Sequence, residues 1–416
     1  MMTGYISPAL VKAGVFHVGK AGLLAQSDQA TFAASTFLGL FIGTIGLGRV
    51  ADRFGRRAIF TASLIWYAVA TLLMASAHGA LDLMLWRLVS GIGIGVELVT
   101  IDAYVSEIAP ARLRGRAFAV NQAIQFLAVP AVALACWRLT PLTVLGLAGW
   151  RWVMILGASG AVGVWIIRAA LPESPRWLAS VGRMAEAEAA MNRIEGSPVS
   201  SAPLTATATG PMIPRARLAE AFAPAYRRRT LMLVALNIFQ AVGFYGVANW
   251  APSLIAARGH TVTQSLGYAF IIAISYPLSP LVASLIADRW ERRTQIIVAA
   301  IATGLLGLAF AGQSAPWVLI ALGVGVTFAA NLMSFAYHAY QSELYPTRMR
   351  ASAVGFVYSW SRISTVASSF VIAALLGAFG AGGVFAFIAL AMAGVVGVVG
   401  LFGPRARGLA LEELSG

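Results

Sequence analysis

Long apolar runs joined by short basic links constrain the fold of this chain most. The link at 48–57 contains four arginines and lies between apolar runs at about 30–50 and 58–77. A helix needs about 20 apolar residues to cross the hydrocarbon core of a bilayer, so both runs can span it. Cytoplasmic loops carry an excess of Lys and Arg. The link therefore predicts two antiparallel membrane helices that are joined on the cytoplasmic side.

Composition extends this prediction to the whole chain. Of its 416 residues, 59% are hydrophobic and 11% are charged, whereas soluble domains carry about 25% charged residues. We therefore predict an all-α, polytopic membrane protein. The net charge of +14 does not indicate a nucleic-acid partner, because the basic residues fall in the short links. A single cysteine, Cys136, and four scattered histidines predict no disulfide, no metal site and no cofactor.

The apolar runs predict twelve membrane helices in two six-helix halves. The expected halves are 1–177 and 230–403, with a cytoplasmic tail at 404–416. Between the halves we expect a cytoplasmic linker, 178–229, with a short amphipathic helix near 181–194. Both termini are expected to be cytoplasmic, in a multi-pass protein of the inner membrane. The expected spans cover Met1 to about residue 15, then 30–50, 58–77, 81–105, 116–138, 150–171, 230–251, 266–287, 294–312, 316–340, 352–378 and 382–402.

An internal repeat supports the two halves. Residues 104–117 align with 340–353 at an offset of 236, with seven of fourteen positions identical, and the basic link at 48–57 has a counterpart at 288–293 at the same offset. A repeat of this kind is typical of transporters built from two related halves. The offset places the start of span seven about six positions before Met1. We therefore expect a truncated first helix and an incomplete N-terminus.

Three motifs resemble those of the major facilitator superfamily. The link at 48–57 is similar to its loop signature, and 87–95 matches its Arg-x-x-x-Gly-x-Gly pattern. Residues 172–178 resemble the exit of span six in sugar porters and in their metabolite:proton symporter relatives. The chain is identified as a member of this superfamily. The resemblance implies a secondary transporter that works by alternating access to a central cavity.

Departures from the family pattern bear on the substrate. Span seven, at 237–250, lacks the paired glutamines and Ser-Gly of sugar porters, which weakens a hexose assignment. Residues 97–104 and 361–363 are more similar to relatives that carry organic or aromatic acids. Span five, around Pro130, lacks the Gly-Pro-rich pattern of drug:proton antiporters. The acid that sugar-porter relatives place early in span one would lie upstream of Met1.

Ionisable residues inside spans are candidates for proton coupling, because a charge at the bilayer centre is costly. Glu97 lies ten residues before Glu107, about 15 Å along a helix, where burial would favour its protonated form. Asp102 and His338 are repeat partners that could face each other across the inner cavity; alternatively, both are solvated at the cytoplasmic mouth. Arg87 is expected to pair with the absent span-one acid or, structurally, with Glu97.

Arg362 is the clearest candidate for substrate binding. It lies twelve residues past Arg350, about 18 Å up span eleven, where a guanidinium can hold a carboxylate by two parallel hydrogen bonds. The alternative is that it ties span eleven to a neighbouring carbonyl or acid. Amides and an aromatic residue on other spans could complete a polar wall, or could form interhelical hydrogen bonds. They are Asn121, Gln122, Gln125, Asn237, Gln240, Tyr245, Asn249 and Asn331.

Charged residues of the inner links are expected to act in gating. Single surface ion pairs contribute little, but a network that breaks on inward opening can bias a two-state equilibrium. The candidates are Asp52, Arg53, Arg56, Arg57, Glu107 and Arg114, with Asp288, Arg289, Arg292, Glu343 and Arg350 in the second half.

Together these features predict a proton-coupled symporter of a small organic acid or related metabolite. Its partners would be the substrate, protons and the lipid bilayer, and we expect a monomer. A neutral sugar porter, an exporter of a small metabolite and a non-transporting membrane sensor remain alternatives. An enzyme is not expected, because the sequence shows no nucleophile–base set and no metal cluster.

Overall fold

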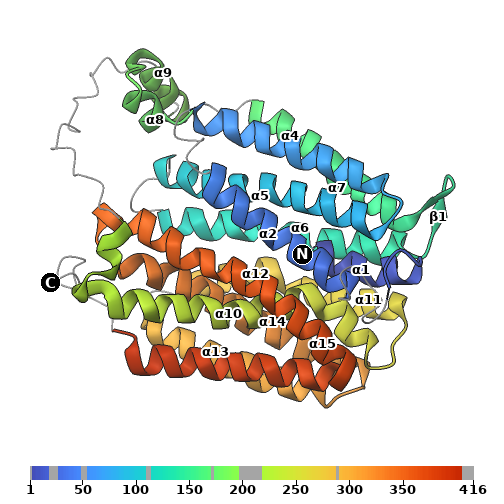
Figure 1. Ribbon diagram of the computed structural model, residues 1–416. Coiled ribbons are helices and arrows are strands. Elements are labelled where there is room, and N and C mark those ends of the chain that lie inside the picture. The colour runs from blue at the N-terminus through green and yellow to red at the C-terminus, as the bar shows by residue number, and fades with distance from the viewer. Residues whose placement is uncertain are drawn as a thin grey trace.

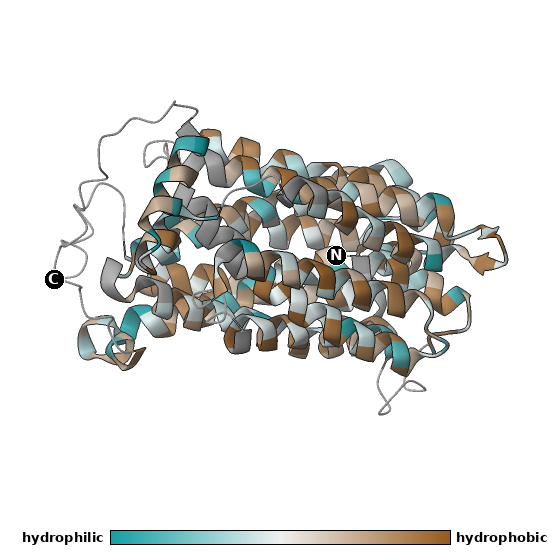
Figure 2. Ribbon diagram, turned by 90° about the horizontal axis from the view of Figure 1, so that it is seen from above, coloured by the Kyte–Doolittle hydropathy of each residue, from teal (hydrophilic) through white to brown (hydrophobic). Residues whose placement is uncertain are grey.

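A bundle of long helices forms the protein, and Figure 1 shows them running side by side. The computed structural model describes residues 2–17, 27–47, 54–108, 114–169, 173–195, 218–286 and 290–404. Apolar residues cover the lengths of the helices in Figure 2, and many hydrophilic residues lie toward the two ends of the bundle. Among the described residues, seven helical stretches are long and apolar enough to cross a membrane.

The first half of the chain supplies six helices of the bundle. A tight hairpin joins the last two, with strands β1 (Thr143–Val144) and β2 (Leu147–Ala148). Its two central residues, Leu145 and Gly146, both have positive φ, as a two-residue hairpin turn requires. The helices are α1 (Met2–Lys12), α2 (Asp28–Leu47), α4 (Arg56–Ala75), α5 (Ala80–Ile108), α6 (Arg114–Leu139) and α7 (Gly149–Ala169).

The second half contains six more helices in the described residues. They are α10 (Pro224–Ala256), α11 (Val262–Ala273), α12 (Ser275–Ile286), α13 (Arg292–Ala311), α14 (Pro316–Glu343) and α15 (Thr347–Phe402). The expected span 266–287 is divided into α11 and α12 around Ile274. The 56 residues of α15 would be about 84 Å long as one helix, far beyond one bilayer core.

Gly380 divides α15 into two membrane-spanning arms. Its φ of 62° and ψ of −160° are not helical, and a side chain would be strained there. In Figure 1 the chain doubles back between the orange and the red helix. The arms correspond to the expected spans 352–378 and 382–402, so the predicted order of twelve spans is confirmed as α1, α2, α4–α7, α10, the α11–α12 pair, α13, α14 and the two arms of α15.

The two halves repeat helix by helix. The bounds of α4 and α13 differ by 236 at both ends, and α5 and α14 begin 236 residues apart. This is the offset of the sequence repeat, so these two pairs of equivalent helices begin at equivalent positions. The predicted all-α fold with two pseudo-symmetric halves is confirmed.

Short helices cover one end of the bundle, opposite the β1 hairpin (Figure 1). They are α8 (Pro175–Ser180) and α9 (Met184–Glu195), and they pack together through Leu178, Ala187 and Ala190. Both carboxylate oxygens of Glu173 accept the backbone N–H of Arg57, at 3.1 Å each. A carboxylate is favourable at a helix N-terminus, so this contact holds the exit of α7 against the start of α4. We call this the α8 end and its opposite the hairpin end.

Candidate substrate and proton site

Arg362 lies at mid-depth of the bundle with its side chain 6% exposed. It is fifteen residues into α15, about 22 Å from the start of the helix. Its Nη1 donates to the Tyr245 hydroxyl at 2.6 Å, and its Nη2 donates to the Tyr358 hydroxyl at 2.7 Å. The guanidinium also lies 5.8 and 4.7 Å from the centroids of these two rings. Within the described residues, its hydrogen-bond partners are neutral.

Tyr245 connects this arginine to the other half of the molecule. It projects from α10 and makes edge contacts with Phe244 and with Phe37 of α2, at centroid distances of 4.9 and 4.6 Å. Because α2 belongs to the first half and α10 and α15 to the second, the Arg362 cluster lies where the halves meet. A solute bound there would contact both halves, as alternating access requires.

His338 belongs to the same cluster. Its Nδ1 lies 2.6 Å from the Ser334 carbonyl and its Nε2 lies 3.2 Å from the Tyr337 hydroxyl. A carbonyl only accepts, so Nδ1 carries hydrogen. The His338 ring also lies against the Tyr358 ring, with centroids 5.2 Å apart. The expected partner of His338 was Asp102, whose side chain lies outside the described residues. Among the described residues, His338 contacts Tyr358, which in turn hydrogen-bonds Arg362.

Arg87 is held by threonines and not by Glu97. Its Nε lies 2.9 Å from the Thr36 hydroxyl, and its Nη2 lies 2.7 Å from the Thr3 hydroxyl. The side chain is 3% exposed and its guanidinium faces the Phe32 ring. The expected Arg87–Glu97 pair is therefore wrong. Glu97 lies ten residues along α5, about 15 Å away along the axis, is part-buried and has a contact of its own.

One of the expected substrate amides has a structural partner on another helix. Asn237 donates from Nδ2 to the Leu233 carbonyl at 2.9 Å and to Oε1 of Gln341, on α14, at 3.3 Å. Asn237 therefore forms an interhelical hydrogen bond between α10 and α14, which was the expected alternative to substrate binding. Its Oδ1 is buried without a partner among the described residues.

Two of the other expected amides have a buried polar atom without a partner among the described residues. Asn331 donates to the Thr327 carbonyl at 2.8 Å, but its Oδ1 has no described partner, and neither does Nδ2 of Asn249. Buried polar atoms without partners are uncommon in folded proteins. Gln240 is 1% exposed. Part-buried amides on α6 complete the set: Asn121, Gln122 and Gln125.

Comparison with known proteins identifies the family. The profile described as "Sugar (and other) transporter" matches residues 5–416. The chain belongs to this transporter family. The metabolite transport protein YyaJ of Bacillus subtilis is 30% identical over 404 residues, which cover 96% of this chain and 87% of that protein. The niacin transporter NiaP of Acinetobacter baylyi is 26% identical over 398 residues, covering 94% and 88%.

The fold matches that of a solved transporter. The structure of the Escherichia coli xylose transporter XylE in a partially occluded inward open conformation has a TM-score of 0.77 at 21% identity, covering 98% of this chain and 95% of that one. The family and the fold together make this chain a multi-pass membrane transporter of the major facilitator type, which carries a sugar or another metabolite and is not an enzyme.

Two gating candidates of the transporter form an ion pair within one half. Arg292 Nε, at the start of α13, lies 3.3 Å from Glu343 Oε1, at the end of α14. Both helices belong to the second half, so this pair fixes neighbours and does not bridge the halves. Another gating candidate, Arg57, donates its backbone N–H to the Glu173 carboxylate, as described above. The other gating candidates lie outside the described residues. They are Asp52, Arg53, Asp288 and Arg289 as whole residues, and Arg56, Glu107, Arg114 and Arg350 as side chains.

At the hairpin end the two halves of the transporter touch directly. A Cβ built on Gly4 of α1 would lie 2.2 Å from the Asn249 carbonyl oxygen of α10, so only glycine permits this approach. Gln29 Nε2 donates to the Ser253 hydroxyl at 2.8 Å. Residues of α1, α2 and α10 therefore close this end.

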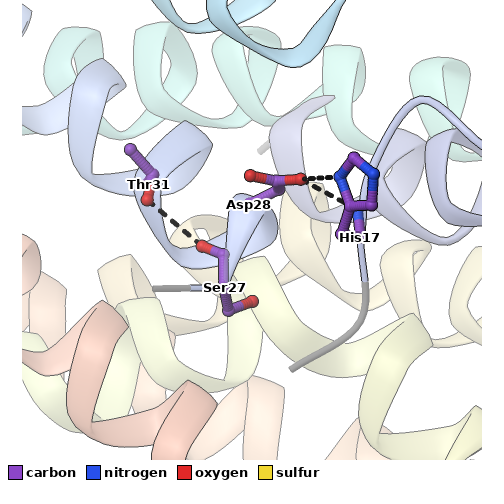
Figure 3. Close-up of polar contacts among 4 residues, drawn as sticks. All are labelled: His17, Ser27, Asp28 and Thr31. Atoms are coloured by element: carbon purple, nitrogen blue, oxygen red, sulfur yellow. Dashed lines mark hydrogen bonds and ion pairs between the residues drawn. The ribbon is translucent and has the colours of Figure 1, made fainter. Parts of the chain in front are cut away.

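Beside this closure, the first residue of α2 is hydrogen-bonded by the segment that follows α1. Figure 3 shows Asp28 accepting from the backbone N–H and from Nδ1 of His17, at 2.8 and 3.1 Å. The Thr31 hydroxyl donates to the Ser27 carbonyl in the same turn. Asp28 is 1% exposed, whereas the His17 side chain is 63% exposed. A carboxylate at a helix N-terminus is favourable, so the contact fixes the entry of α2.

Sequence reasoning missed several residues of the site. Tyr358 is four residues before Arg362, a spacing that places both side chains on one helix face, and this signal was available in the sequence. The sequence spacing gave no comparable signal for the other residues, because they contact helices that are far apart in the chain. These residues are Tyr337, Phe37, Thr3 and Thr36.

Proposed function

We propose that the transporter carries a small organic acid together with a proton. The observation that supports this most is the Arg362 guanidinium, buried between two phenols with no carboxylate partner among the described residues. A buried cation is costly unless it is paired. A substrate carboxylate would supply that pairing and can accept two parallel hydrogen bonds from one guanidinium.

The relatives are consistent with an acid without requiring it. NiaP, at 26% identity, is named as a niacin transporter, and niacin is a pyridine carboxylic acid. A solved structure of XylE is described as a proton:xylose symporter, which supports proton coupling and keeps the neutral sugar as the second candidate. A sugar would use the amides of α6 and α10, but it would leave the charge of Arg362 uncompensated.

The remaining roles follow from the same proposal. Glu97, Asp102 and His338 are the groups that could carry the proton. The α8 end would face the cytoplasm, because the arginine-rich links lie there, and the inner-link charges would contribute to gating. The transporter would work as a monomer, since each chain contains both halves around its own Arg362 cluster.

The test compares carboxylates with sugars on purified protein in proteoliposomes. The panel is acetate, benzoate, nicotinate, xylose and glucose. We expect carboxylates to raise the melting temperature and to be taken up faster with an inward proton gradient, and a protonophore should abolish the gain. Arg362→Lys should weaken carboxylate binding by about tenfold or more, because lysine cannot form the bidentate contact.

A matched control is Arg228→Lys, which alters an exposed arginine of the same half that lies over the Phe402 ring and should leave affinity unchanged. Binding of sugars alone would contradict the acid and favour the second candidate. Carboxylate binding without uptake or counterflow would contradict transport and indicate a sensor.

A further inference from the structure

We propose that the β1–β2 hairpin is an interfacial anchor, which holds its apolar side chains among the lipids of the leaflet at the hairpin end. The hairpin lies within residues 140–148, which connect α6 to α7, and it projects from the end of the bundle (Figure 1). It is remote from the Arg362 cluster, so the anchor does not depend on which substrate is carried.

The hairpin exposes a continuous apolar surface. Its exposed large side chains all lie within six positions, and residues 139–150 contain no charged residue. One exposed apolar side chain is ordinary on a protein surface, but a contiguous patch marks contact with another protein or with a membrane. The patch consists of Leu142, Val144, Leu145 and Leu147.

The tip of the hairpin is held rigidly in a conformation that leucine rarely adopts. Leu145 is 85% exposed and has a φ of 51°, in the left-handed region where Asn, Asp and Gly are favoured in a two-residue turn. The Gly149 N–H donates to the Leu142 carbonyl at 2.9 Å, and Trp152 Nε1 donates to the Val144 carbonyl at 3.0 Å. A leucine is therefore presented in a fixed position where a polar residue would be less strained and better hydrated. Contact with hydrocarbon would offset both costs.

The flanking helices place the hairpin at the membrane surface. The 21 residues of α7 are about 31 Å long, just enough to cross a hydrocarbon core of about 30 Å. The 26 residues of α6 are about 39 Å long, so this helix extends into the headgroup layer. Arg138 in the last turn of α6 and Arg151 in the first turn of α7 mark the same level, because a charge avoids the hydrocarbon. The base of the hairpin therefore lies in the interfacial layer.

The apolar surface continues from the hairpin onto α7. Leu156, Val162 and Trp165 are exposed along this helix. Exposed apolar side chains on the outside of a membrane-spanning helix face lipid. The leaflet that covers α7 is thus the immediate neighbour of the hairpin, which favours lipid over a water-soluble protein as its partner.

The experiment attaches an environment-sensitive fluorophore to Leu145→Cys in proteoliposomes. Cys136 is buried and is the single native cysteine, so the unmutated protein gives the background labelling. Ser314→Cys is the matched control, because Ser314 is exposed in the polar turn between α13 and α14 at the same end. Relative to the Ser314 label, the Leu145 label should emit at shorter wavelength. Phospholipids spin-labelled near the headgroup end of the acyl chain should quench it severalfold more, and iodide in the water should quench it severalfold less.

Each outcome decides between lipid, water and protein around the hairpin. A Leu145 label that iodide quenches as strongly as the Ser314 label would overturn the anchor. A label that is shielded from iodide but is not quenched by the spin-labelled lipids would overturn lipid as the partner and indicate a protein, such as a second copy of the chain. Leu147→Cys repeats the measurement at an exposed position outside the turn, so a local change at Leu145 cannot produce the result; the anchor requires both labels to agree.

Discussion

At the scale of single residues, two buried arginines are held by neutral hydroxyls. Arg87 is bonded by Thr3 and Thr36, and Arg362 by Tyr245 and Tyr358. The two sites differ in what their partners connect. The threonines come from α1 and α2 of the same half as Arg87, whereas Tyr245 also contacts α2 across the boundary between the halves. Arg87 is therefore suited to holding the helices of the first half together. Arg362 is suited to responding to the position of one half relative to the other.

The role of Arg87 can be tested by removing one hydroxyl. Thr36→Val keeps the side-chain shape but removes the acceptor that lies 2.9 Å from Arg87 Nε. Leaving a buried charged donor poorly satisfied costs about 1–3 kcal/mol, so the thermal unfolding temperature in detergent should fall. Ser35→Ala is the control, because within the described part of the chain the Ser35 hydroxyl bonds just the carbonyl of its own preceding turn, at Thr31. Equal effects of the two changes would contradict a special role for Thr36.

At the scale of elements, α2 and α5 approach closely along small residues. A Cβ on Gly91 would lie 2.6 Å from the Thr36 carbonyl oxygen, and one on Gly39 would lie 2.3 Å from the Leu88 carbonyl oxygen. Small residues allow membrane helices to approach closely enough for dispersion and hydrogen bonds to act. This contact brings Thr36 within reach of Arg87, so helix packing determines the arginine's partner.

Glycine at this contact should not tolerate a methyl group. Gly91→Ala would place Cβ against backbone, which cannot move cheaply, and overpacking of this kind costs about 1–3 kcal/mol. Gly163→Ala on α7 is the matched control, since a Cβ there meets nothing within 4 Å, and alanine is favoured over glycine in helices by up to about 1 kcal/mol. Thermal unfolding of both variants in detergent should shift in opposite directions. A Gly91→Ala protein as stable as wild type would contradict the close packing.

At the scale of the whole molecule, the hairpin end is closed by contacts between the halves. Gly4 lies against Asn249, and Gln29 hydrogen-bonds Ser253. Alternating access requires the halves to separate at one end at a time. The Arg362 cluster lies deeper in the bundle, so opening of the hairpin end would give it a path from the outer side.

Locking the hairpin end should stop transport. Cys136 is buried and is the single cysteine of the chain, so a pair of cysteines can be added to the native background. Gln29→Cys with Ser253→Cys, bridged through two disulfides by a short bis-methanethiosulfonate reagent, should abolish uptake because the halves cannot part. A reducing agent should restore uptake, and each single variant with the same reagent should remain active. Continued uptake by the bridged protein would contradict opening at this end.

The sequence by itself determined the twelve spans, the repeat and the fold. A bilayer requires each span to be apolar, long enough and internally hydrogen-bonded, and these demands are met locally along the chain. The bounds of α4 and α13 could therefore be predicted to within about two residues. The division between α11 and α12 near Ile274 was not predicted, although Pro277 is a local signal for it, because proline cannot donate a hydrogen bond to the carbonyl four residues earlier, at Ala273.

Tertiary structure decided the partners of the buried polar side chains. Arg362 and Tyr245 were predicted for the substrate site and lie together, but Arg87 meets Thr3 and Thr36 instead of Glu97. The His338 ring contacts the rings of Tyr337 and Tyr358. The alignment of His338 with Asp102 in the repeat did not indicate these two contacts. A side chain's partner depends on which faces of distant helices come together, and that arrangement is set by packing across the whole bundle, which no local stretch of sequence encodes.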